Sequence, residues 1–280
     1  MIKGLDLGDA VMHRYRQIEI ICGAAMEVIK CHPRGMRKGT KRQSVQKTPE
    51  AIREANMRQS ARHLARLINA NFRPGDLHVI LTYRKENRPD RQQAKDNLKK
   101  FREAMRDKYK KAGMVLRWIA VTEYKNKAIH HHMIINNIND GGLTTADYIR
   151  QLWKGRGSPK FVQLYDDAEY DQLADYLIKE TEKTFREPDS PEKQRYSCSR
   201  NLAQPKVTRK DKQIKGDWEQ DPKPRKGYYI VKDSLYNGVD KLGYMYQRYV
   251  MVKLNPVDTD WPSNELKPIR RRRKRVHRKC

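Results

Sequence analysis

The stretch that decides the fold is Ile129-His-His-His-Met-Ile-Ile135. Its apolar second half predicts a strand buried in a sheet. Side chains alternate between the two faces of a strand, so His130 and His132 point to one face and His131 points to the other. Two imidazoles on one face can bind a divalent ion if both rings are neutral and a third ligand lies nearby. The alternative is a chance cluster of histidines on a surface strand.

A second strand, predicted from Val115 to Tyr124, comes just before this run. Only residues 125–128 separate the two strands, which favours an antiparallel hairpin. In that hairpin Glu123 lies close to the histidines. Its carboxylate would complete a set of two histidines and one acid, with positions left open for water and phosphate. The alternative is a surface ion pair between Glu123 and Lys125 or Lys127.

The charge of the chain indicates the class of its partner. Lys and Arg number 61 against 34 Asp and Glu, for a formal net charge of +27 over 280 residues. Such an excess is typical of a nucleic-acid-binding protein. Two basic runs, 34–43 and 270–279, are suited to neutralise phosphates, although solvation alone also explains such runs. The predicted DNA-binding residues are Arg34, Arg37, Lys38, Lys41, Arg42, Arg156, Arg200, Arg270, Arg271, Arg272 and Arg273.

Other classes of protein are disfavoured by what the sequence lacks. No apolar run approaches the ~18 residues that a membrane span requires, and the first ten residues do not form a secretory signal. The four cysteines include no CxxC pair, as expected in a reducing cytoplasm. No Walker A motif is present, so a helicase would have to be a separate protein. We therefore expect a cytoplasmic protein without a membrane partner.

Several further elements follow from periodicity and capping signals. Thr48-Pro49-Glu50 predicts a helix start, with Ala61, Leu64, Ala65 and Ile68 forming the apolar face of that helix. The remaining predictions are strands at 77–83 and 161–165, and helices at 90–112, 145–153 and 169–182.

The helix predicted at 169–182 offers a nucleophile. Tyr176 and Lys179 lie three residues apart, on one face of that helix. A phenol has an ordinary pKa of about 10, so neighbouring cations are needed to favour the phenolate. The pattern is common, and its alternative reading is a half-buried tyrosine beside a solvated lysine. Tyr170 and Tyr148 are rival candidates on pattern alone.

The order of these pieces resembles a known enzyme class. A strand ending in Leu81-Thr82-Tyr83, then His130-x-His132, then Tyr176-x-x-Lys179 is similar to the three motifs of the HUH endonucleases. In particular, the chain resembles the rolling-circle replication initiators of phages and plasmids that use one catalytic tyrosine. The resemblance covers roughly residues 18–205. One departure is His131, because the middle position of the histidine pair is usually a bulky apolar residue.

The resemblance implies an α+β fold, with a ferredoxin/RRM-like core built on a central antiparallel sheet of about five strands flanked by helices. It implies that His130, His132 and Glu123 bind Mg²⁺ or Mn²⁺. Tyr176 would attack a phosphate of a single-stranded DNA origin, with or without a hairpin, to leave a 5′-phosphotyrosyl link and a free 3′-OH. Lys179 would support this centre. A bacterial host would supply the helicase and the DNA polymerase.

The chain divides into four expected parts: a strand and basic arm (1–48), the nickase core (49–205), a tyrosine-rich extension (206–260) and a basic tail (261–280). The tyrosines of 227–252 either stack on unpaired bases or cover the core. Two rival functions stay open, a non-catalytic nucleic-acid-binding protein and an HUH relaxase or transposase. Relaxases usually place the tyrosine ahead of the histidines, so the order found here favours replication initiation.

Overall fold

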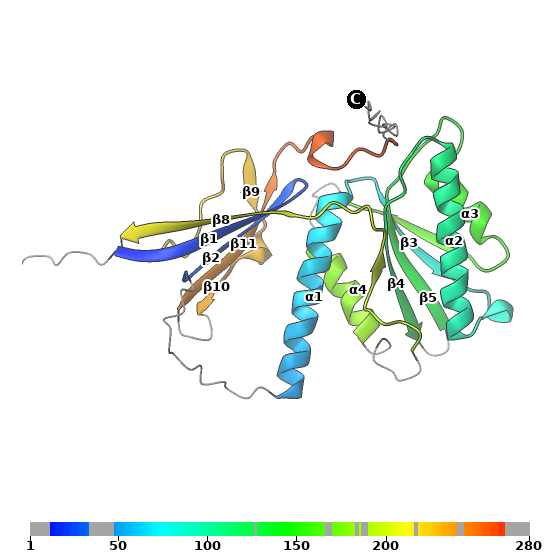
Figure 1. Ribbon diagram of the computed structural model, residues 1–280, viewed down its shortest axis with the longest axis horizontal. Coiled ribbons are helices and arrows are strands. Elements are labelled where there is room, and N and C mark those ends of the chain that lie inside the picture. The colour runs from blue at the N-terminus through cyan, green and yellow to red at the C-terminus, as the bar shows by residue number, and fades with distance from the viewer. Residues whose placement is uncertain are drawn as a thin grey trace, which may run out of the picture.

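A five-stranded antiparallel sheet forms the centre of the core in this computed structural model (Figure 1). The structure describes residues 12–33, 48–125, 128–165, 170–182, 185, 190–215, 218–239 and 244–266. The core strands run in the order β6 (Pro159–Gln163), β3 (Leu77–Thr82), β5 (Ala128–Ile135), β4 (Trp118–Lys125) and β7 (Ser197–Cys198). Every neighbouring pair is antiparallel. The predicted α+β class and its central sheet of about five strands are confirmed.

Four helices cover the two faces of this sheet. α1 (Pro49–Asn71) and α4 (Asp171–Glu182) pack on one face, together with Ile119, Val121 and Ile134. α2 (Arg91–Lys111) and α3 (Thr145–Trp153) pack on the other. The apolar face predicted for α1, Ala61, Leu64, Ala65 and Ile68, is buried as expected.

The helix starts follow from local capping. Thr48 accepts a hydrogen bond from the backbone nitrogen of Ala51 at 3.2 Å, with Pro49 at the first helical position. Asp90 and Gln93 form a reciprocal capping box at the start of α2. Because each side chain satisfies an otherwise unpaired backbone N–H group, the two starts lie where the sequence places them.

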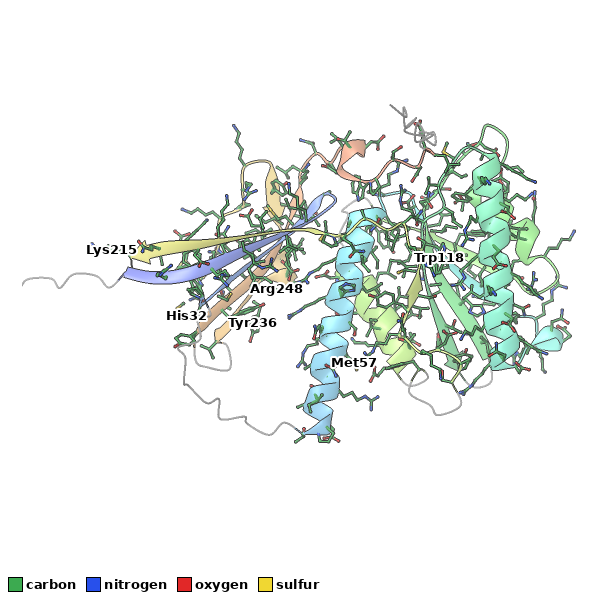
Figure 2. All side chains as sticks on the ribbon, in the orientation of Figure 1. His32, Met57, Trp118, Lys215, Tyr236 and Arg248 are labelled. Carbon is green, nitrogen blue, oxygen red and sulfur yellow. The ribbon has the colours of Figure 1, made fainter. Side chains whose placement is uncertain are left out.

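A second sheet joins the two ends of the described chain. Its strands are β1 (Met12–Cys22), β2 (Ala25–Cys31), β8 (Lys206–Lys215), β10 (Tyr236–Val239) and β11 (Met245–Lys253), in the order β10-β11-β2-β1-β8, with β9 (Tyr228–Ile230) also paired to β11. β1 and β8 project from the body of the molecule (Figure 1), and Lys215 marks their outer end (Figure 2). Three 3₁₀ helices, Lys85–Asn87, Lys232–Ser234 and Asp258–Asp260, lie in connections.

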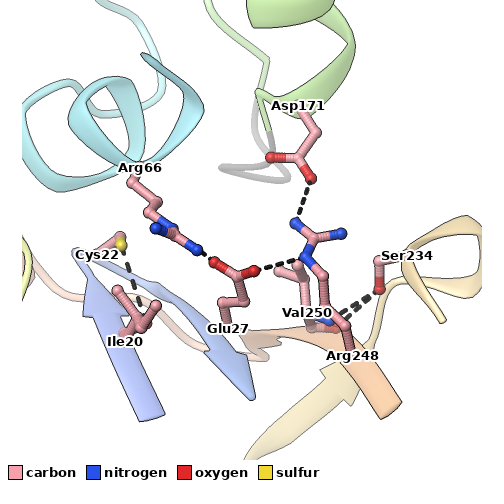
Figure 3. Close-up of polar contacts among 8 residues, drawn as sticks. All are labelled: Ile20, Cys22, Glu27, Arg66, Asp171, Ser234, Arg248 and Val250. Atoms are coloured by element: carbon pink, nitrogen blue, oxygen red, sulfur yellow. Dashed lines mark hydrogen bonds and ion pairs between the residues drawn. The ribbon is translucent and has the colours of Figure 1, made fainter. Parts of the chain in front are cut away.

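The second sheet is anchored to the core by a close turn and a buried ion-pair network. Gly23 has a φ of +61°, and a Cβ there would come within 2.3 Å of the Asn69 carbonyl oxygen, so the turn between β1 and β2 requires glycine. Glu27 of β2 is 4% exposed and pairs with Arg66 of α1 at 2.6 Å and Arg248 of β11 at 2.5 Å. Arg248 also reaches Asp171, the first residue of α4, at 3.4 Å (Figure 3).

The tyrosines of the C-terminal extension divide between the two expected roles. Tyr249 is buried, whereas Tyr228, Tyr229 and Tyr246 are half-buried against the second sheet. Tyr236 and Tyr244 are exposed. None of the helices in the described residues is long and apolar enough to span a membrane.

Candidate active site

The hairpin register brings the predicted ligands to one face of the core sheet. Glu123 of β4 lies directly opposite His130 of β5, and His132 lies opposite Val121. Residues opposite each other in an antiparallel pair share a face. Glu123, His130 and His132 therefore all point to the face that α1 and α4 cover. The side chains of Lys125 and Lys127, the alternative partners of Glu123, lie outside the described residues.

His132 is the centre of this group. Its Nε2 atom lies 3.3 Å from Oε2 of Glu123, and its Nδ1 atom lies 3.2 Å from Nε2 of His78 on β3. Burial, with the nearby charge of His130, lowers the pKa of His132 to about 4. Burial and the neighbouring His132 lower the pKa of His78 to about 4 as well. Both rings are therefore neutral near pH 7, the state that a metal ligand requires.

His131 points to the opposite face and is fully buried in the core. Its Nδ1 atom shares a hydrogen bond with the Thr122 hydroxyl at 3.0 Å, and its Nε2 atom shares one with the Tyr83 hydroxyl at 2.9 Å. Trp153 meets the ring edge-on. With both nitrogens occupied inside the core, His131 has a structural environment and stands apart from the other two histidines.

Tyr176 of α4 lies over the histidine face. Its ring packs edge-to-face on His132, with 5.6 Å between ring centroids, while 43% of the residue stays exposed. Burial, then the charges of Glu180 and Glu123, raises the pKa of Tyr176. Tyr176 is therefore open to a ligand and adjacent to the predicted metal-binding face, but its phenolate is disfavoured in the absence of a nearby cation.

The other catalytic candidates are placed differently. Lys179 is exposed, one turn beyond Tyr176 on α4. Tyr170 is 2% exposed and donates a hydrogen bond to the Tyr165 carbonyl oxygen. Tyr148 is 5% exposed, packs with the α2–α3 core and donates a hydrogen bond to Asp140. Of the three tyrosines, only Tyr176 combines exposure with contact to the histidine face.

Ion pairs hold α4 at both ends. Glu182 near its C-terminus pairs with Arg53 of α1 at 2.9 Å and with Arg195 at 2.6 Å. Asp171 at its N-terminus is reached by Arg248 of the second sheet. Together with the buried side chains of Ala174, Leu177, Ile178 and Thr181, these contacts set the position of Tyr176 over the sheet.

The donor set fits a divalent ion in kind, since neutral imidazole nitrogens and a carboxylate oxygen are ordinary ligands of Mn²⁺ and related metals. In this conformation the donors bond to one another instead. Both ring nitrogens of His132 are occupied, by Glu123 and His78. Within the described residues, no three side chains of His, Cys, Asp or Glu converge on one point that could hold an ion. Side-chain rotation at Glu123 and His132 would be required for joint binding.

Two residues near this centre were not predicted from the sequence. His78 lies on the same sheet face as His132, in a neighbouring strand of the sheet, and His-x-Ile spacing in the run Leu77–Thr82 was the available signal. Glu180 lies one turn after Tyr176 and affects the pKa of both Tyr176 and His132. Its i, i+4 spacing from Tyr176 was the signal there.

Most of the predicted DNA-binding residues fall outside the described part of the chain. These are Arg34, Arg37, Lys38, Lys41, Arg42, Arg270, Arg271, Arg272 and Arg273. Arg156 is half-buried, with its guanidinium 5.5 Å from the Trp153 ring centroid and bonded to the Leu152 carbonyl. Arg200 is exposed just after β7. Neither Arg156 nor Arg200 has a described contact with Tyr176 or the histidine face.

The outer strand β8 is a basic surface that the sequence reading did not single out. Its exposed cations are Lys206, Arg209, Lys210, Lys212 and Lys215. Its one acid, Asp211, is paired with Arg16 at 2.7 Å. Exposed lysines are a common way to protect an edge strand from pairing with other chains, and they also suit contact with phosphates.

Comparison with known proteins supports the resemblance. Residues 76–185 match the family model described as replication-associated protein ORF2, a family of rolling-circle replication initiators. No curated protein and no solved structure matches the chain. The matched segment runs from the start of β3 past the end of α4 and so contains Glu123, both predicted histidine ligands and Tyr176. The resemblance to rolling-circle replication initiators is therefore confirmed over this segment, while the second sheet lies outside it.

Proposed function

We propose that this replication-associated chain is a single-stranded DNA endonuclease and ligase that nicks an origin to start rolling-circle replication. The observation that carries the proposal is the placement of Tyr176. Its exposed ring lies on His132, 5.6 Å between centroids, at the face that also holds His130 and Glu123. A nucleophile next to a potential metal-binding face is the arrangement that phosphodiester transfer requires.

In the proposed reaction, the Tyr176 oxygen attacks the scissile phosphorus and forms a phosphotyrosyl bond. The phosphorus bond to the 3′ oxygen breaks, and that oxygen leaves as a 3′-OH after gaining a proton. The phenol loses its own proton in the attack, and the carboxylates of Glu123 and Glu180 are close enough to influence that proton. Because one phosphoester replaces another, the 3′-OH can later reverse the step and join the ends without ATP.

We propose His130, His132 and Glu123 as the residues that would hold Mg²⁺ or Mn²⁺. When bound, such an ion would polarise the scissile phosphate and offset developing negative charge. The carboxylates that raise the pKa of Tyr176 make this requirement specific to the site. Exposed Lys179 is proposed to support the same charge from the solvent side of α4. The remaining parts of the proposal are a cytoplasmic location in a bacterial host and host helicase and polymerase partners.

The test is covalent capture of DNA. The protein is incubated with single-stranded DNA from the replicon that encodes it, with Mn²⁺, and a protein–DNA adduct is sought on a denaturing gel. Tyr176→Phe should give no adduct while its affinity for the same DNA stays within about twofold. The matched control is Tyr236→Phe, an exposed tyrosine on the second sheet, which should form adduct normally. An undiminished adduct from Tyr176→Phe would remove Tyr176 from this role.

Metal dependence is tested in the same assay. Chelation with EDTA should abolish the adduct, and Mn²⁺ should restore it. His132→Ala and Glu123→Ala should lose adduct formation by about 100-fold or more, because each removes a proposed first ligand. DNA binding with no adduct from any variant, at any metal concentration, would instead support a non-catalytic nucleic-acid-binding protein.

A further inference from the structure

A cavity of about 550 Å³ shares a wall with the proposed nucleophile. It lies between the outer edge of the core sheet, at β6, and the start of α4. Its lining includes His78, Val162, Gln163, Tyr165, Gln172 and Tyr176. A volume of this size lies within the ~300–1,000 Å³ range of ordinary ligand sites. Tyr176 thus faces the histidine group and also this cavity.

The lining of the cavity is apolar where it is most exposed. Tyr165 is 71% exposed, Tyr176 43% and Val162 41%. These three are among the few large apolar or aromatic side chains in the described residues that stay exposed, and all of them line this one cavity. Exposed apolar side chains gathered at one place on a highly charged protein indicate a binding site.

The charge of the lining limits what the cavity can bind. Among the described residues around it, none is Lys, Arg, Asp or Glu. A phosphate would find no cation there, and a metal ion would find no carboxylate. A flat, neutral group fits better, with Tyr165 available for stacking and the amides of Gln163 and Gln172 able to donate and accept hydrogen bonds.

We propose that this cavity binds an unpaired nucleobase of the DNA strand that is nicked, and that Tyr165 is its stacking residue. The inference rests on the proposed function, because Tyr176 is then the point that the scissile phosphate reaches. A nucleotide adjacent to that phosphate carries its base to the neighbouring wall. Tyr165 thereby becomes a residue that positions the strand, without taking part in bond making or breaking.

The test compares two oligonucleotide probes of about twelve nucleotides, within the ~4–16 nucleotides typical of single-strand binding sites. One is fluorescein-labelled oligothymidylate, and the other is the same backbone with every base removed. Both are titrated by fluorescence anisotropy in a Tyr176→Phe background, which keeps the aromatic wall and prevents covalent reaction. The variants are Tyr165→Ala, Tyr165→Phe and, as the matched control, exposed Tyr236→Ala on the second sheet (Figure 2).

Tyr165→Ala should weaken oligothymidylate binding about 5- to 150-fold, the range for loss of one stacked base, and should leave abasic binding within about twofold. Tyr165→Phe and Tyr236→Ala should bind both probes as the parent does. Two results would overturn the proposal: unchanged oligothymidylate affinity in Tyr165→Ala, or an equal loss for both probes. Adduct formation is measured separately with Tyr176 intact, so a missing adduct would count against the nicking activity and leave the stacking result readable.

Discussion

His131 makes the stability of the core depend on pH in a way that can be isolated from the proposed active site. Its ring is fully buried between Thr122 and Tyr83, and burial, followed by the charges of Arg102 and the adjacent histidines, lowers its pKa to about 3. In the unfolded chain the same imidazole has a pKa of about 6.5. The unfolded state therefore binds a proton at a pH where the folded state does not.

The direction and size of the effect follow from this difference. A histidine with a lowered folded pKa contributes stability that is fully present above about pH 6.5 and is lost as the pH falls toward the folded pKa. Between pH 6.5 and pH 5 the folded ring stays neutral, so each pH unit costs about 1.4 kcal/mol. The loss at pH 5 is then about 2 kcal/mol. This figure depends on the unfolded pKa and hardly on the folded value, as long as the folded value stays well below 5.

His131→Gln removes the titrating group and keeps an amide that can bond to Thr122 and Tyr83. The free energy of unfolding is measured by urea titration at pH 7, 6 and 5 for the parent and the variant. The parent should lose about 2 kcal/mol more than the variant between pH 7 and pH 5. His78 and His132 titrate in both proteins and cancel in the comparison.

Tyr83→Phe is the matched control, because it removes the Tyr83 hydrogen bond and leaves the imidazole in place. It should be less stable at every pH but keep the slope of the parent. Equal slopes for the parent and His131→Gln would refute the reasoning, since the folded ring would then have to accept a proton as readily as the unfolded one. Retained adduct formation in His131→Gln would further separate this histidine from the proposed ligands.

Two more predictions concern the second sheet. Glu27→Ala should lower the free energy of unfolding by about 3–5 kcal/mol at neutral pH, because it leaves Arg248 buried without its principal partner; a loss below about 1 kcal/mol in urea titration would show that the network does not anchor the sheet. Lys210→Gln with Lys212→Gln should reduce the slope of log affinity against log salt for single-stranded DNA by about 1.4, at about 0.7 per phosphate contact, in anisotropy titrations. The control pair is Lys99→Gln with Lys100→Gln, equally exposed on α2, and an equal change in that control would mean that β8 is no special contact surface.

Local sequence determined the elements of the core and much of the candidate site. Alternation along the β5 strand separates His131 from His130 and His132, and the short connection to β4 sets the register that brings Glu123 opposite His130. Helix starts at Thr48 and Asp90 depend on neighbours within three residues. All of these features depend on backbone geometry over a few residues, so a single sequence is sufficient to predict them.

Tertiary structure alone decided which distant segments meet. β1 pairs with β8 across most of the chain length, and His78 meets His132 because β3 and β5 are neighbours in the sheet. Glu27 reads as a polar break in an apolar strand until α1 and β11 supply its arginines. The cavity beside Tyr176 exists because β6 pairs with β3 at the edge of the sheet, next to α4. Residue patterns specify which face a side chain occupies, whereas the strand order that chooses its neighbours is set by the packing of the whole core.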